Sequence, residues 1–176
     1  MKVLLEIFVV TPETDDQIGY RRREFDISED PRDPDELVHA ALSDPDGGLP
    51  PLDIGRCLVH STSWRHAGAG ILVLTYLVFG EWIDFAGVAR ECLRLSAEGQ
   101  TPGGTATRPR PRQIDACDVV RHGMRHIGHL VQRRASCVSP SWLGERSRTL
   151  FAALEPEVAG RIRSESGDPG GVASVG

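Results

Sequence analysis

Residues 54–79 read IGRCLVHSTSWRHAGAGILVLTYLVF and contain two strand-like stretches, 54–64 and 71–79. The segment between them, 65–70, contains glycines that can adopt positive φ at a tight connection. These features predict a β-hairpin over about residues 54–79. The second stretch is apolar at successive positions, which is typical of a strand that has other elements packed on both faces. We therefore place this strand near the centre of a sheet that helices cover.

Further elements are predicted before the hairpin. The apolar stretch 3–10 predicts a buried strand, and its interruption by Glu6 argues against a secretory signal peptide. Residues 22–28 alternate in a way that permits a second, exposed strand. Asp33 and Pro34 supply an N-cap and a first-turn proline, so a short helix is expected to follow them.

Helices dominate the prediction after the hairpin. Apolar residues over 82–97 recur near helical spacing, which predicts a helix packed on the sheet. They are Trp82, Ile83, Phe85, Val88, Ala89, Cys92 and Leu95. Residues 99–113 are interpreted as a flexible linker or loop rich in proline and arginine. A helix at 114–134 and another after it form a predicted C-terminal helical hairpin within 114–163, and 164–176 is expected to be a disordered tail.

The composition fits one small α+β protein. The chain has 176 residues, of which 40% are hydrophobic and 26% charged, as in ordinary globular domains. We expect a small, mainly antiparallel sheet in residues 1–98. The four cysteines form no CxxC pair, so no disulfide framework is predicted. The longest apolar run, 71–79, is too short for a membrane-spanning helix, and a cytoplasmic protein without membrane contact is expected.

Charge is unevenly distributed along the chain. The net charge is −5, with acidic residues concentrated in 1–60 and arginines in 108–134. Lys2 is the single lysine, and such heavy arginine use is typical of a bacterial, GC-rich genome. The arginines suggest phosphate contacts with nucleic acid as one hypothesis. Nucleic acid is not the expected partner, however, because aromatic residues are not interleaved with these arginines and the protein is acidic overall.

The helix predicted at 114–134 has two distinct faces at about 100° per residue. Its apolar stripe consists of Cys117, Val120, Met124, Ile127 and Val131. Asp115, Asp118, His122, His126 and His129 share the other face. If the apolar stripe docks on the sheet, the histidine face is expected to point away from it.

Two histidines on this face have the spacing of metal ligands. His122 and His126 are one helical turn apart and can bind the same divalent cation, such as zinc. A further ligand would come from elsewhere, with His60, His66 or an N-terminal acid as candidates. His129, on the same helix, is another candidate ligand. The alternative is that the histidines are polar residues of a solvated helix face. On a regular strand, His60 would share one face with Thr62 and Trp64.

The stretch VVRHGMRHIGHLV, residues 119–131, resembles the final-helix motif of DinB-like metal-dependent bundles, in which two histidines a turn apart precede a glycine. The resemblance implies that His122 and His126 are metal ligands and that the fold is a four-helix bundle. It covers only this short stretch, and His129 stands where that family usually has glutamine.

The sequence is therefore most consistent with a non-catalytic binding or accessory module. It would act through protein or small-ligand contacts, through self-association as a possible homo-oligomer, and without a cofactor. The exposed side of the histidine helix and the adjacent sheet edge form the predicted surface, with Asp118, Arg121, Arg125 and Arg133 as contact residues. The first alternative is a small metal-dependent enzyme that uses His122 and His126, and the second is arginine-mediated nucleic-acid binding.

Overall fold

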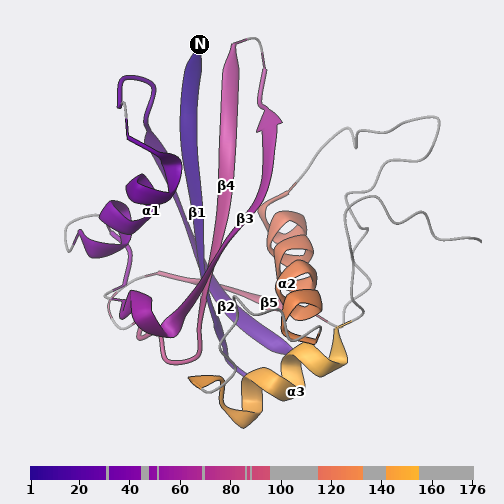
Figure 1. The fold of residues 1–176 in the computed structure, drawn as a ribbon. Helices are drawn as coiled ribbons and strands as arrows, with labels where there is room; N and C mark the ends of the chain where they lie inside the picture. Colours follow the sequence, from indigo (N-terminus) through magenta and orange to yellow (C-terminus); the bar gives the residue numbers. More distant parts are fainter. Residues whose placement is uncertain are drawn as a thin grey trace, which may run out of the picture.

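A computed structural model describes residues 1–30, 32–44, 48–50, 52–68, 70–85, 87, 89–95, 115–132 and 142–154. It confirms the α+β class, with one five-stranded sheet between helices (Figure 1). The elements are β1 (Lys2–Pro12), β2 (Gln17–Asp26), α1 (Pro34–Ser43), the 3₁₀ turn η1 (Ile54–Arg56), β3 (Cys57–His66), β4 (Ile71–Gly80), β5 (Glu91–Arg94), α2 (Ala116–Gln132) and α3 (Glu145–Ala153).

The strand order is β3-β4-β1-β2-β5. β3 and β4 pair in antiparallel register, which confirms the predicted hairpin, although the first strand begins at Cys57, after η1. β1 occupies the centre of the sheet and pairs in parallel with β4, so the sheet is mixed and the hairpin lies to one side. β3 is consequently an edge strand.

Two apolar clusters lie on opposite faces of this sheet. β1 contributes to both, because successive side chains of a strand point to opposite faces. Leu5 and Ile7 pack with α1, whereas Phe8 packs with α2 and α3. Figure 1 shows α1 on one side of the sheet and α2 on the other. The expected two-sided cover of β4 is therefore present, but α1 supplies one side of it.

The first turn of α1 is capped as predicted. Asp33 is the N-cap, and its side chain accepts a hydrogen bond of 2.9 Å from the Asp35 backbone N–H. Tyr76 on β4 donates a hydrogen bond of 2.6 Å to Asp35 Oδ1, which ties the helix to the sheet. Burial, together with the hydrogen bond to Asp35 and its charge, raises the pKa of Tyr76 to about 12.

The helix predicted over 82–97 is wrong. Trp82 lies in a turn after β4, and β5 forms further along, where it pairs with β2. Leu93 and Leu95 are buried whereas Arg94 is exposed, which is the two-residue alternation of a strand. The helical interpretation failed because a few apolar residues in a short window can match both the helical period and the two-residue alternation of a strand.

The helices after β5 pack on the sheet and on each other. The apolar stripe of α2 is buried at Val120, Met124 and Ile127, as predicted. Gln132 on α2 donates a hydrogen bond of 2.8 Å to the carbonyl of Phe151 on α3. Residues 133–141 of the connection between the two helices, the linker at 99–113 and the tail at 164–176 lie outside the described residues.

The five-stranded sheet differs from the four-helix bundle that the resemblance to DinB-like proteins implies. In the described part of the chain, no helix combines the length and the apolar character needed to cross a membrane.

Two glycines of α2 provide a test of how closely this helix approaches the sheet. A Cβ atom on Gly123 would lie 2.7 Å from Leu77 Cδ1 and 2.9 Å from Thr62 Cγ2, whereas on Gly128 it would be 3.6 Å from its nearest neighbour, on Phe151. We expect Gly123→Ala to lower the free energy of unfolding by about 1–2 kcal/mol, because overpacking outweighs the gain in helix propensity. Gly128→Ala should raise it by up to about 1 kcal/mol. Urea denaturation measures both, and equal stabilisation of the two variants would contradict the close approach.

Candidate functional site

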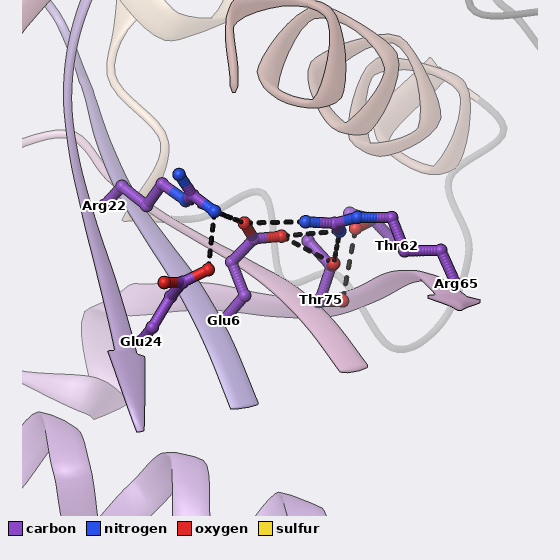
Figure 2. A network of polar contacts seen from close by, with 6 residues as sticks. All are labelled: Glu6, Arg22, Glu24, Thr62, Arg65 and Thr75. Atoms are coloured by element: carbon purple, nitrogen blue, oxygen red, sulfur yellow. Dashed lines mark hydrogen bonds and ion pairs between the residues drawn. The ribbon is translucent and has the colours of Figure 1, made fainter. Parts of the chain in front are cut away.

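A buried carboxylate connects four strands on the sheet face that α2 covers. Glu6 on β1 is only 1% exposed. It accepts hydrogen bonds from Arg22 Nε on β2 at 2.7 Å, from Arg65 Nη1 and Nη2 on β3 at 2.7 and 2.9 Å, and from Thr75 Oγ1 on β4 at 2.8 Å (Figure 2). The Glu6 cluster, defined as these four residues with Glu24, is thus assembled from separate parts of the chain.

Arg22 limits the repulsion between the two glutamates of this cluster. Glu6 and Glu24 lie directly opposite each other on β1 and β2. Like charges in that position repel. Arg22 Nη2 contacts both carboxylates, at 2.7 Å from Glu6 and 2.6 Å from Glu24. The guanidinium therefore allows two glutamates to occupy neighbouring strands.

Opposing effects act on the pKa of Glu6. Burial alone would raise this pKa, because a charged carboxylate is poorly solvated there. Hydrogen bonds from Arg65 and Thr75 and the positive charges of Arg65 and Arg22 outweigh burial, so the pKa lies below its ordinary value. Glu6 is consequently ionised at neutral pH.

A β-bulge brings Arg65 into the Glu6 cluster. The register of β3 against β4 shifts between Ser61, which is opposite Tyr76, and Ser63, which is opposite Thr75. Thr62 is the extra residue, and its hydroxyl donates to the Thr75 carbonyl at 3.2 Å. A bulge changes which side chains point to each face beyond it.

The expectation that His60, Thr62 and Trp64 share one face is therefore wrong for Trp64, whereas His60 and Thr62 both lie towards α2. After the bulge, Trp64 lies opposite Leu74, on the face that α1 covers, whereas Arg65 is on the same face as His60. The prediction assumed a regular strand, and local sequence contains no clear signal for the additional residue.

The structure brings three of the four candidate metal ligands together. The ring centroids of His122 and His126 are 4.5 Å apart, and the ring of His60 lies 5.8 Å from that of His126. Burial and the nearby His122 lower the pKa of His60. His129 is half-buried on the same helix, and the ring contacts described here involve the other three histidines.

The expected outward orientation of the whole histidine face is wrong for His122 and His126. α2 lies close to the edge of the sheet, with Gly123 against Thr62 and Leu77. Residues that flank the apolar stripe can therefore reach β3, and His126 contacts His60 there. Nevertheless, among the described residues no group of three or more His, Cys, Asp or Glu side chains has an arrangement that could hold a metal ion.

The predicted contact residues of α2 are less exposed than the sequence suggests. The side chain of Arg121 is 15% exposed and forms an ion pair of 3.7 Å with Asp118. Arg125 is half-buried, and Arg133 lies outside the described residues. These arginines do not present one open basic surface within the part of α2 that can be described.

The most exposed aromatic residues lie elsewhere. Trp64 on β3 is 69% exposed and Trp82, after β4, is 74% exposed. The ring of Trp64 meets the ring of His66 edge-on, with centroids 6.0 Å apart. Sequence periodicity missed Trp64 as a surface residue, because it placed this side chain on the face of His60.

Comparisons with known proteins leave the site to be interpreted from its geometry. No family model, curated protein or solved structure matches the chain.

The lowered pKa of Glu6 predicts how stability depends on pH. A carboxylate whose folded-state pKa lies below its unfolded value of about 4.3 contributes its full stabilisation above that pH, and the contribution is lost as the pH falls through the folded-state pKa. We expect Glu6→Gln to lower the free energy of unfolding at pH 7 by about 2–3 kcal/mol, because it removes charge-assisted hydrogen bonds. The variant should also lose part of the acid sensitivity below pH ~4.

Glu24→Gln is the matched control, since its carboxylate is exposed and shares Arg22 with Glu6. It should cost less than about 1 kcal/mol, as expected for a surface ion pair. Chemical denaturation at several pH values measures both variants. Equal effects of the two substitutions would show that Glu6 has no special role.

Proposed function

We propose that this protein is a non-catalytic binding module whose partner adds to the edge strand β3. One observation carries the proposal: β3 is a ten-residue strand at the end of the sheet, and among the described residues no strand pairs with its outer side. An edge strand presents backbone N–H and C=O groups that can pair with another chain. Many peptide-binding domains use this mode of recognition.

The two edges of the sheet differ in their capacity for such pairing. β5, at the other end of the sheet, has four residues, so it offers a short template. β3 is long enough for several backbone hydrogen bonds and also carries the exposed Trp64. Tryptophan is enriched among residues that dominate binding energy at interfaces. This combination supports the β3 side as the binding edge.

The Glu6 cluster supports a structural rather than a catalytic role for its carboxylate. Four hydrogen bonds from Arg22, Arg65 and Thr75 occupy the acceptor positions of Glu6. A general base must accept a proton from a substrate, and a catalytic pKa usually lies near the working pH. Glu6, held ionised by two arginines, is better suited to fixing strand register.

The exposed tryptophans provide a matched test of the binding edge. Candidate partners captured from cell extract are to be purified and titrated against the wild-type protein. We expect a genuine partner to slow hydrogen exchange in β3, and Trp64→Lys to weaken its affinity by at least about tenfold. Trp82→Lys should leave the affinity within about twofold, because Trp82 is equally exposed but lies outside β3.

If no purified partner slows exchange in β3, or if the two tryptophan variants weaken binding equally, β3 is not the binding edge.

A metal-dependent enzyme is the second candidate, and the approach of His60 to His126 is the observation in its favour. Metal analysis of protein purified without an affinity tag separates the two functions. We expect only a small fraction of an equivalent of divalent metal, with no change in His126→Ala. Stoichiometric zinc that is lost in His60→Ala and His126→Ala, but kept in His129→Ala, would instead support the enzyme.

A further inference from the structure

The hairpin that carries the proposed binding edge differs in charge from the rest of the protein. The chain has 25 acidic residues, yet none occurs between Ile54 and Gly80. The same segment contains Arg56, His60, Arg65 and His66. The long edge strand β3 of this acidic protein therefore carries no negative side chain.

The charges along β3 differ in their accessibility. Arg56, just before β3, and His66, its last residue, are exposed. Arg65 is engaged by Glu6, with its side chain 26% exposed. Arg56 and His66 thus place positive or protonatable groups near the two ends of the strand.

Acidic residues that reach the hairpin from other elements are already hydrogen bonded. Glu6 is bound by Arg65 and Thr75, and Asp35 accepts from Tyr76. Asp53, just before η1, accepts from the Gly55 backbone N–H. A hydrogen bond from a neutral donor does not remove the charge of a carboxylate. The charge of Glu6 is balanced by Arg22 and Arg65, and β3 itself carries no acidic side chain.

We propose that the partner of β3 is an extended, acidic segment of another protein. This inference rests on the proposed binding at the β3 edge and adds the chemistry of the partner. Backbone pairing with β3 supplies sequence-independent affinity, and complementary charge selects among possible segments. A strand of about ten residues spans roughly 33 Å, so acidic residues near both ends of the segment face Arg56 and His66.

Selection of random peptides on the purified full-length protein tests the charge preference directly. The probe is a displayed library of linear peptides of about twelve residues, selected at low salt. We expect selected peptides to contain at least about twice the Asp and Glu frequency of the input library, because attraction between exposed charges is strong at low ionic strength. Affinity of a selected peptide, measured by fluorescence anisotropy, should fall at least about tenfold towards 0.5 M salt, where the screening length is only a few ångströms.

Charge-reversed variants distinguish the β3 edge from general attraction. Arg56→Glu combined with His66→Glu should weaken binding of a selected acidic peptide by at least about tenfold. The matched control is Arg94→Glu on β5, the opposite edge, where the arginine is also exposed. Equal weakening by the control would overturn the proposal, since the attraction would then be nonspecific.

The outcomes separate this inference from the proposed function. Peptides that require Trp64 but show no acidic preference would retain the binding edge and overturn the acidic partner. Failure to select any peptide would overturn the extended segment, even if a purified folded protein slows exchange in β3. A stable homodimer that the double charge reversal abolishes would assign the edge to a second copy of this chain and also overturn the acidic partner.

Discussion

The ion pairs of Glu6 with Arg22 and Arg65 join the central strand β1 to the strands β2 and β3. Together with Thr75, they connect β1, β2, β3 and β4 through a carboxylate that is only 1% exposed. Replacing such a pair by apolar residues often costs little stability, whereas removing one partner alone is strongly destabilising because it leaves a buried charge. A one-residue slip of β3 would move Arg65 to the other face and leave Arg22 as the one arginine paired with Glu6 in this cluster.

The contact between Arg65 and Glu6 is linked to the orientation of the side chains on the edge strand β3. The bulge at Thr62 allows Arg65 to reach Glu6, and it also turns Trp64 to the opposite face, where this side chain is exposed. Bulges are found at sheet edges, where they redirect side chains and restrict indiscriminate pairing. The structural cluster and the proposed binding surface are therefore two consequences of one additional residue in β3.

The histidines show why a motif needs its surroundings. His122 and His126 have the spacing of metal ligands, and the fold adds His60 beside them. Proximity is not coordination, however, and no metal-holding arrangement is present among the described residues. Gly123 accounts for the proximity instead, because its missing side chain allows α2 to approach Thr62 and Leu77.

The sequence alone determined the features that depend on neighbouring residues. These include the α+β class, the β3–β4 hairpin, the cap of α1 at Asp33 and the apolar stripe of α2, because alternation, helical period and capping act over a few positions. Only the tertiary structure decided that β1 is central, that residues 91–94 form a strand, and that Glu6 is a buried anchor. Glu6 was visible as a single acid within an apolar strand, but its partners Arg22, Arg65 and Thr75 are distant in the chain. Pairing between distant strands selects these contacts, and local periodicity contains no information about strand order.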